Sequence, residues 1–276
     1  MRFHALVLAS ALAAPLAAQV PDSAAAADSA AGGARRARDA AREEVLRGAH
    51  AVRWYEAAGV AGAVAILMTV DEPVHRYVQR HRSRTLGDVA SVFRHEGEPI
   101  YYAGVSFGVL AAGVIADDPD VTRAGGRLVA SVGLSGVAMQ GVKLLVGRSR
   151  PNEGVGAFSF HPFTGLADSA GIEARGSFPS GHTTAAFAVA TTLADDIDSP
   201  VADVLLYTLA TGAGWSRLYE NRHWLSDVAM GAALGVTSAK LVSGRWRIFR
   251  LRPPGFLVTP TGAPALTWAV PLPPLR

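Results

Sequence analysis

The chain has 276 residues, enough for one large domain or two small ones with a buried core. Half of its residues are hydrophobic and 18% are charged, a balance between that of a soluble globular protein and that of a dense membrane protein. The net charge of +3 comes from scattered arginines and not from a clustered basic face, which argues against nucleic-acid binding. The lack of cysteine in these residues excludes disulfides, thiolate metal sites and cysteine nucleophiles.

The N-terminal residues have the layout of a signal peptide. Arg2 supplies one positive charge, an apolar stretch continues to about Ala14, and small residues follow Pro15. This layout predicts a signal peptide over residues 1–18 with cleavage after Ala18. The alternative is an uncleaved anchoring helix, and both interpretations imply export.

Residues 19–50 are rich in Ala, Asp, Arg and Ser and have almost no large apolar side chains. Such a segment buries too little surface to order itself well. We therefore predict a tether between the signal peptide and the first domain.

Apolar stretches of helical length fill the middle of the chain. They are rich in Ala, Gly and Val, which allows helices to approach closely, and none of them alternates like a strand. Asp71-Glu72-Pro73 and Asp117-Asp118-Pro119 are predicted helix stops. We therefore predict an all-α bundle of about six helices over residues 51–245. The stretches are residues 51–70, 99–116, 124–146, 183–197, 200–216 and 224–242.

The composition leaves open whether these helices cross a bilayer. A span needs about 20 mostly apolar residues, and charges such as Arg127, Asp203 and Lys240 interrupt the candidates. After a signal peptide, three true spans would also place the loop behind the third helix in the cytoplasm. Two alternatives remain: a membrane-embedded bundle, or a periplasmic bundle that buries its apolar faces against itself.

Residues 246–276 form a proline-rich C-terminal tail. A Pro-Thr-Gly turn separates Phe256-Leu257-Val258 from an apolar segment that begins at Leu266. This pattern predicts a short hairpin or a tail that contacts the cell envelope.

Two cations lie where a predicted helix ends. Lys143 occurs in an otherwise apolar segment, where a charge without a partner is costly, although a lone lysine can also snorkel. Arg150-Pro151 follows seven residues on, just past Gly147, so its guanidinium can turn back toward the same helix end. Both are candidates for holding a phosphate group, whose oxygens need fixed cations.

A Pro-Ser-Gly-His sequence immediately precedes an Ala-rich helix. Pro179, Ser180 and Gly181 form a tight helix entry whose free backbone N–H groups can bind an anion. His182 falls in the first turn, where an imidazole can donate a proton to a leaving alkoxide. Without a second histidine, a capping loop would be the simpler interpretation.

That second histidine lies in the segment that joins two later apolar helices. His223 and Asp227 are four residues apart, so on a helix they share a face. A carboxylate bonded to one ring nitrogen would fix the tautomer and leave the other nitrogen free to attack phosphorus. Arg217 supplies a bidentate donor for the phosphate. An isolated His–Asp pair is commonly a plain helix contact, but here three such elements coincide.

Together these elements resemble the signature of the type 2 phosphatidic acid phosphatase (PAP2) superfamily, which includes bacterial class A acid phosphatases and vanadium haloperoxidases. The chain has, in the family's order, Lys143-x6-Arg150-Pro151, Pro179-Ser180-Gly181-His182 and Ser216-Arg217-x5-His223-x3-Asp227. The resemblance covers residues 51–245. It implies an all-α phosphatase that uses neither a metal nor another cofactor.

The resemblance also implies a role for each matching residue. His223 is the expected nucleophile, Asp227 orients it, and His182 first protonates the leaving group and then acts as a base toward water. The residues expected to hold the phosphate are Lys143, Arg150, Ser180, Gly181 and Arg217.

The predicted function is that of a bacterial envelope phosphatase that cleaves phosphate monoesters or diphosphates through a phosphohistidine. The expected substrate is a phosphorylated lipid, of phosphatidic acid, isoprenoid diphosphate or lipid A type, or a small phosphoester. Membrane contact is expected, with a periplasm-facing site in the inner membrane or on a membrane-associated periplasmic protein; nucleic acid is not an expected partner. The alternatives are a vanadate-dependent haloperoxidase, a soluble periplasmic acid phosphatase and a non-catalytic envelope protein.

Several other titratable residues fall outside the signature. Glu98 and Asp203 interrupt apolar helices, and we interpret them as helix ends or solvent-facing positions and not as buried functional carboxylates. The remaining histidines are interpreted as surface residues, with His161 also a candidate rim contact because its loop should border the site. These histidines are His50, His75, His81, His95 and His161.

Overall fold

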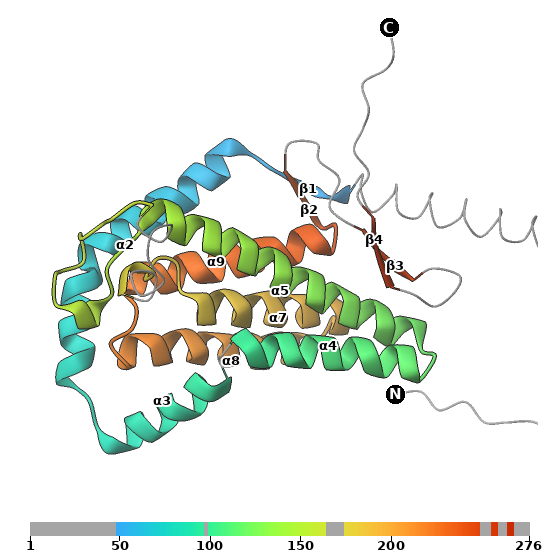
Figure 1. Cartoon of the computed structure of the whole chain (residues 1–276), viewed down its shortest axis with the longest axis horizontal. Helices are drawn as coiled ribbons and strands as arrows, with labels where there is room; N and C mark the ends of the chain where they lie inside the picture. The colour runs from blue at the N-terminus through green and yellow to red at the C-terminus, as the bar shows by residue number, and fades with distance from the viewer. Residues whose placement is uncertain (1–47, 97–98, 164–173, 249–254, 259–263, 268–276) are drawn as a thin grey trace, which may run out of the picture. The chain divides into compact units, whose positions relative to one another are not determined.

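The computed structural model describes residues 48–96, 99–163, 174–248, 255–258 and 264–267, all within one compact unit. The predicted signal peptide, nearly all of the predicted tether and Glu98 lie outside the described residues. The described part is a helical bundle with two short strand pairs, so the all-α prediction is confirmed (Figure 1).

Seven α-helices and one short 3-10 helix lie within the described residues. Four of the six predicted stretches correspond closely to helices, and the first and third extend further than expected. One helix, over residues 84–96, was not predicted. The helices are α2 (Trp54–Arg80), α3 (Arg84–Glu96), α4 (Pro99–Ile115), α5 (Pro119–Val146), η1 (Pro151–Glu153), α7 (Gly181–Ile197), α8 (Pro200–Tyr219) and α9 (Leu225–Val242).

The predicted stop at Asp71-Glu72-Pro73 is wrong, because α2 continues through Pro73 to Arg80. Proline removes one backbone hydrogen bond from a helix interior and is normally unfavourable there. Here Asp71 is fully buried, pairs with Arg148 at 2.7 Å, and accepts a hydrogen bond from the Ser226 N–H at 2.9 Å. These tertiary contacts hold the helix at the point where the local sequence favours a break.

The predicted stop at Asp117-Asp118-Pro119 is confirmed. The α4 helix ends at Ile115, and the Asp118 carboxylate caps α5 by accepting from the N–H groups of Asp120 and Val121. Pro119 at the first helical position needs no N–H partner.

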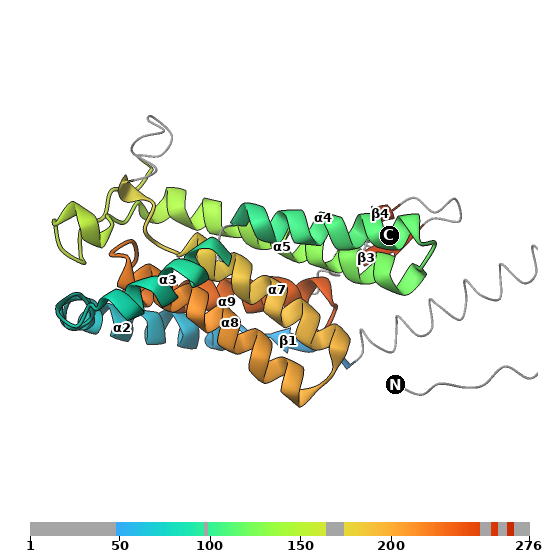
Figure 2. The same cartoon turned by 90° about the horizontal axis from the view of Figure 1, so that it is seen from below.

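Small residues let the helices pack closely. A Cβ atom added at Gly113 of α4 would lie 2.3 Å from the Thr122 backbone nitrogen of α5, and one added at Gly235 of α9 would lie 2.4 Å from the Thr184 carbonyl oxygen of α7. Figure 2 shows α4 and α5 side by side, with α7 and α9 next to them and α8 beside α7. The predicted close approach is thus a property of the folded bundle.

The helices alternate in direction, so each end of the bundle holds the starts of some helices and the ends of others. Helices α2, α5 and α8 finish at one end, and α7 and α9 begin there (Figure 1). We call this end the site end and the opposite one the far end. Because α7 starts with the Pro-Ser-Gly-His sequence and α9 starts at the His223 segment, the predicted site elements all fall at the site end.

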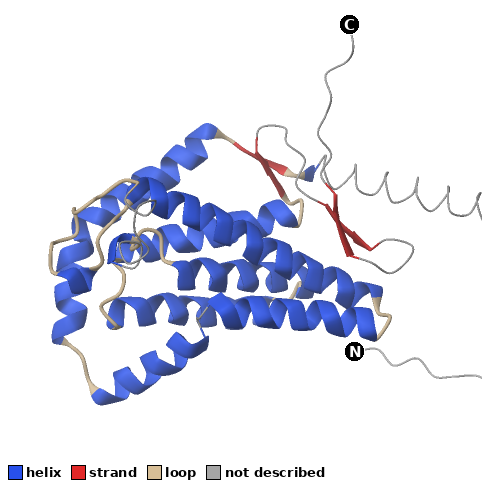
Figure 3. Ribbon diagram, in the orientation of Figure 1, coloured by secondary structure: helices blue, strands red, loops and turns tan. Residues whose placement is uncertain are grey.

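Two short strand pairs flank the helices (Figure 3). Strand β1 (His50–Val52) pairs in parallel with β2 (Trp246–Ile248), so the residues just before α2 lie beside those just after α9. Strand β3 (Gly255–Val258) pairs antiparallel with β4 (Pro264–Thr267), with Phe256 opposite Leu266. The hairpin prediction for the tail is therefore confirmed for the described residues.

Three helices, α2, α5 and α9, are long and apolar enough to cross a membrane. A fourth span is formed if residues 84–94 of α3 and the α4 helix, bent by 44°, count as one. Many large apolar side chains lie on the outer surface. Those more than half exposed include Ile66, Ile100, Val105, Phe107, Val137, Val204, Leu205 and Leu209. Such a surface is costly in water, so the protein is a membrane protein.

Candidate active site

The eight predicted site residues converge at the site end although they come from five separate segments. Lys143 is in the last turn of α5, Arg150 precedes η1, and Arg217 is in the last turn of α8. Ser180 caps α7, and Gly181 and His182 form its first turn. His223 directly precedes α9, and Asp227 lies in its first turn.

A left-handed glycine turns the chain from Lys143 toward Arg150. Gly147 caps α5 with φ of +57°, and its N–H donates to the Lys143 carbonyl at 2.9 Å. A Cβ atom here would lie 1.8 Å from the His161 carbonyl oxygen, which leaves no room for a side chain. The loop then returns, and the His161 N–H donates to the Gly147 carbonyl at 2.8 Å. This loop therefore keeps Arg150 near the end of α5.

The start of α7 brings backbone N–H groups to the same place. Ser180 is fully buried, and its N–H donates to the Asp227 carbonyl at 3.0 Å, which joins the starts of α7 and α9. Its hydroxyl makes no capping bond and instead accepts from the Thr183 hydroxyl at 2.9 Å. A Cβ atom at Gly181 would lie 3.9 Å from Lys143 Nζ. A helix N-terminus beside an ammonium group suits an anion such as phosphate.

Arg217 and His182 contact each other across the site. Arg217 is only 4% exposed; its Nη2 donates to Glu220 at 2.9 Å, and its Nη1 lies 3.4 Å from His182 Nε2. A guanidinium can only donate, so Nε2 of His182 carries a lone pair in this arrangement. Burial lowers the pKa of His182 to about 3, and the neighbouring Arg217, His223, Lys143 and Arg150 lower it further. A bound phosphate would oppose those charges and raise this pKa, which prepares His182 to act as an acid only when substrate is present.

His223 is held by a different partner from the one predicted. Its Nδ1 lies 2.8 Å from the Ser177 carbonyl oxygen but 3.6 Å from Asp227 Oδ2, which is too long for a hydrogen bond. A carbonyl only accepts, so Nδ1 carries the proton and Nε2 is free to act as a nucleophile. The predicted direct His–Asp hydrogen bond is thus replaced by a backbone contact, with Asp227 acting electrostatically from nearby.

Burial also keeps His223 neutral. It lowers the pKa of His223 to about 4; Asp227 opposes this effect, and the charges of Lys143 and Arg150 add to it. Above about pH 4 the imidazole is therefore unprotonated and nucleophilic. Its side chain is only 4% exposed, so a reacting group must enter the cluster of cations to meet it.

Three functional candidates were missed from the sequence. Arg148 and Asp71 are fully buried beneath the site, where Arg148 contacts both Asp71 and Asp227 at 2.7 Å. The Ser177 hydroxyl donates to Asp227 Oδ2 at 2.5 Å. Asp71 directly follows an apolar stretch, which is a usable signal, whereas the spacing of Arg148 does not distinguish it from an ordinary loop arginine.

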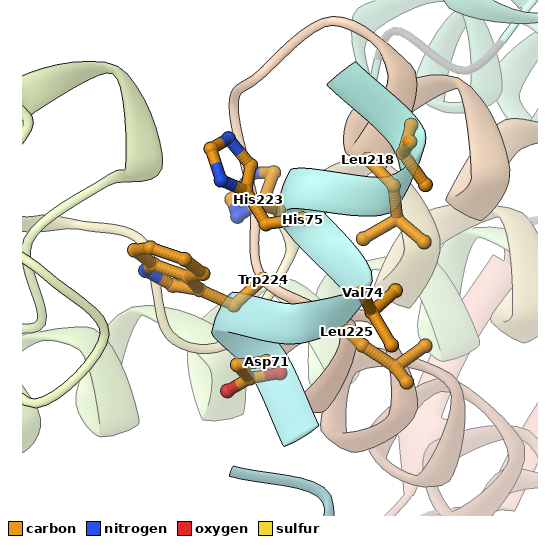
Figure 4. Close-up of a pocket in the computed structure, with 8 residues that line it drawn as sticks. Asp71, Val74, His75, Leu218, His223, Trp224 and Leu225 are labelled. Carbon is orange, nitrogen blue, oxygen red and sulfur yellow. The ribbon is translucent and has the colours of Figure 1, made fainter. Parts of the chain in front are cut away.

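His75 was interpreted as a surface residue, and this is wrong. It is half-buried, its Nε2 lies 2.5 Å from Asn221 Oδ1, and its ring packs edge-on against Trp224. It lines a small pocket together with His223 (Figure 4). The reason is the continuation of α2 past Pro73, which carries His75 to the site end.

The other predictions outside the signature have mixed outcomes. His50 and His81 are exposed, as expected, and His161 lies in the loop that follows Arg150. Asp203 is in the first turn of α8, in agreement with its interpretation as a helix end. The side chain of His95 lies outside the described residues. Within the described residues, no group of three His, Asp or Glu side chains is arranged to hold a metal ion.

Comparison with known proteins agrees with this geometry. Residues 124–249, which contain all eight predicted site residues, match the PAP2 superfamily. This part of the chain belongs to that superfamily. The resemblance of the signature is therefore confirmed at the level of the family.

The matches to curated relatives cover only part of each relative's length. A lipid A 1-phosphatase of Porphyromonas gingivalis is 48% identical over 75 residues, which are 26% of this chain and 16% of that protein. Lipid A 1-phosphatases of Rhizobium etli and Rhizobium johnstonii are each 32% identical over 142 residues, or 49% of this chain and 58% and 55% of those proteins. The chain thus matches less than two thirds of each relative.

Two solved structures are similar. The transmembrane PAP2-type phosphatidylglycerolphosphate phosphatase of Bacillus subtilis has a TM-score of 0.53 at 21% identity, over 69% of this chain and 95% of that one. Aquifex aeolicus LpxE has a TM-score of 0.48 at 22% identity, over 62% and 92%. The first of these shows that the PAP2 fold is shared.

Proposed function

We propose that the protein is a metal-independent phosphatase of phosphorylated lipids that works through a phosphohistidine on His223. The observation that carries this proposal is the convergence of Lys143, Arg150 and Arg217 on two histidines that are neutral in the unliganded protein. Such a cluster of cations favours the binding of an anion. The free Nε2 of His223 is then the buried nucleophile that meets the phosphorus.

The proposed reaction has two displacements. In the first, His223 Nε2 attacks phosphorus, the bond from phosphorus to the leaving oxygen breaks, and His182 gives that oxygen a proton. In the second, His182 takes a proton from water, the water oxygen attacks phosphorus, and the phosphorus–nitrogen bond breaks to release phosphate. Lys143, Arg150, Arg217 and the first N–H groups of α7 hold the phosphoryl oxygens through both steps.

The proposed substrate class is a phosphorylated membrane lipid, with lipid A 1-phosphate as the first candidate. Support comes from the relatives named as lipid A 1-phosphatases and from the apolar outer surface of the bundle. Phosphatidic acid and isoprenoid diphosphates belong to the same class of substrate.

The test of activity uses the full chain in detergent with a chelator present. Phosphate release is measured for lipid A, phosphatidic acid, an isoprenoid diphosphate and a soluble aryl phosphate, with His223→Ala as the matched variant. We expect release from at least one lipid, an acid-labile and base-stable phosphoenzyme, and neither in His223→Ala. Turnover by His223→Ala equal to that of the unchanged protein would overturn the mechanism.

We further propose that the bundle lies in the inner membrane with its site facing the periplasm. The residues before α2 and after α9 pair as β1 and β2 at the far end, where α2 begins and α9 finishes. In a bundle that spans the membrane, these residues therefore lie on the opposite side from the site end. A periplasmic site therefore cannot coexist with both cleavage after Ala18 and a fully spanning bundle. Reporters fused after Gly154, at the site end, and after Asp117, at the far end, decide this; a cytoplasmic signal after Gly154 would overturn the proposal.

A further inference from the structure

Arg148 lies at the base of the site and has no exposed surface. Its Nη1 donates to Asp227 Oδ1 and to the Ser226 hydroxyl, each at 2.7 Å. Its Nη2 donates to Asp71 Oδ2 at 2.7 Å, and both Nη2 and Nε donate to the Ala157 carbonyl. Each of the three guanidinium nitrogens thus donates to an acceptor, an arrangement that a single ammonium group could not reproduce.

Asp71 completes this arrangement from α2. Its Oδ1 accepts from the Ser226 N–H at 2.9 Å, and its Oδ2 accepts from the Ser226 hydroxyl at 2.5 Å as well as from Arg148. Two carboxylates therefore share one guanidinium. If both carboxylates are ionised, this buried set has a net charge of −1 directly beneath the nucleophile.

Ser177 links the set to His223. Its N–H donates to the Arg148 carbonyl at 3.0 Å, its hydroxyl donates to Asp227 Oδ2, and its carbonyl accepts from His223 Nδ1. Asp227 is thereby held through both oxygens, by Arg148 at Oδ1 and by Ser177 and the Trp224 N–H at Oδ2. Movement of Arg148 would shift both the carboxylate and the backbone that orients the imidazole.

We propose that Arg148 and Asp71 are positioning residues for the phosphatase reaction, which hold Asp227 and the Ser177 carbonyl in the arrangement that presents Nε2 of His223 to the phosphorus. This inference rests on the proposed function. It also explains why α2 continues through Pro73, since Asp71 reaches Arg148 and Ser226 only on an intact helix.

A role in stability alone does not account for the burial of Arg148 together with Asp71 and Asp227. A buried ion pair contributes little to stability compared with well-packed apolar residues, because removing charges from water is costly. The two carboxylates instead place negative charge beside the His223 imidazole, which becomes positive as its bond to phosphorus forms. The other titratable and charged groups that face His223 are Lys143 from α5, Arg150 from the following loop, His182 from α7, Arg217 from α8 and His75 from α2.

The first test is Asp71→Asn, which keeps an oxygen acceptor for the Ser226 N–H and removes one negative charge. We expect kcat to fall about tenfold with KM within twofold, since the phosphate-holding residues are unchanged. We also expect the acid limb of the kcat/KM profile to move to lower pH by about one unit, because the lost carboxylate no longer stabilises the protonated imidazole. A residue that only stabilised the fold would reduce the amount of active enzyme without moving this limb.

The second test separates charge from geometry. Arg148→Lys keeps the positive charge but not the fork, and we expect kcat to fall about 10- to 100-fold with the acid limb in place. The double variant Asp71→Asn/Arg148→Gln removes one charge of each sign. We expect its acid limb to return to that of the unchanged protein while its kcat stays low, because Asp227 has lost its anchor.

The matched control is Asp195→Asn. Asp195 is also a nearly buried carboxylate in an ion pair, with Lys240 at 2.5 Å, but it lies about 20 Å from His182 along α7. Its kcat and acid limb should equal those of the unchanged protein. Should Asp71→Asn fail to fold in detergent, Ser226→Ala removes a hydroxyl bonded to both Asp71 and Arg148, and it should lower kcat severalfold with KM unchanged.

The outcomes separate this inference from the proposed function. Absence of phosphate release by the unchanged protein on every lipid would overturn the proposed function. An active protein whose Asp71→Asn and Arg148→Lys variants match it in kcat and in acid limb would overturn the positioning role and leave the phosphohistidine mechanism standing. A fall in kcat that Asp195→Asn reproduces would also overturn it.

Discussion

The two ends of the bundle both bury charged side chains, but they arrange them in different ways. At the far end, charges of opposite sign pair across helices: Arg127 of α5 with Asp196 of α7, and Lys240 of α9 with Asp195 of α7. At the site end, Lys143, Arg150 and Arg217 converge on two histidines. The site end also has ion pairs, such as Arg217 with Glu220, but its cations gather around one point and so favour binding of an anion.

The lowered pKa values of the two histidines reflect the positive surroundings at the site end. His182 has a pKa of about 3 because it is buried among positive charges, and His223 one of about 4 because burial outweighs the nearby Asp227. The two largest effects are expected at the site end, and each has a counterpart at the far end that should be unaffected.

The largest effect is expected for His223→Ala. We expect phosphate release to fall by at least about 1,000-fold, because the variant lacks the imidazole that accepts the phosphoryl group in the proposed reaction. The measurement is release from a lipid substrate in detergent, with Asp195→Asn as the far-end counterpart that should retain full activity. A far-end variant that lost as much activity would remove the distinction between the two ends.

The next largest effect is expected for Arg217→Ala. Loss of a charge-assisted bond to the phosphoryl group should lower kcat/KM by about 100-fold, or about 2.7 kcal/mol. Arg127→Ala removes an arginine of the same kind at the far end and should change kcat/KM less than twofold. Equal losses would contradict the assignment of Arg217 to the phosphate.

The pH profile should follow the titration of His223. The neutral imidazole is the reactive form, and its pKa in the folded protein is about 4, so kcat/KM should be constant at mildly acidic pH and fall as the pH drops through about 4. Arg150→Gln removes a charge that lowers this pKa and should move the limb to higher pH. A limb that stayed near pH 6.5, the ordinary value for histidine, would show that His223 is not buried as described.

Stability should also depend on pH through the two histidines. Their pKa values are lower in the folded protein than in the unfolded chain, so unfolding takes up protons between about pH 3 and 6.5 and stability falls as the pH drops through this range. Thermal unfolding in detergent should show this fall, and His182→Gln should make it shallower. Inorganic phosphate should raise the unfolding temperature of the unchanged protein, and an equal rise in Arg217→Ala would contradict phosphate binding at this site.

The smallest effect is expected at the far end. Asp196→Asn breaks the partly exposed pair with Arg127 and should lower the free energy of unfolding by about 1 kcal/mol or less, with kcat unchanged. The measurement is denaturant unfolding beside the activity assay. A loss of activity greater than the loss of folded protein would show that the far end contributes to the reaction.

The sequence by itself determined the all-α class, the helix boundary at Asp118-Pro119 and the eight residues of the candidate site. These features depend on short-range patterns: a cap and a proline at a helix start, apolar stretches of helical length, and a signature made of three parts that are each short. Such patterns are visible without knowing which helices pack together.

Only the tertiary structure decided what surrounds those residues. The contacts that carry α2 through Pro73 link Asp71 to Arg148 and Ser226, 77 and 155 positions away. The same packing brought His75 to the site and gave His223 the Ser177 carbonyl as its partner in place of Asp227. The burial of the site residues and the charges around them depend on helices that are distant in the sequence. The local pattern of residues therefore does not predict them.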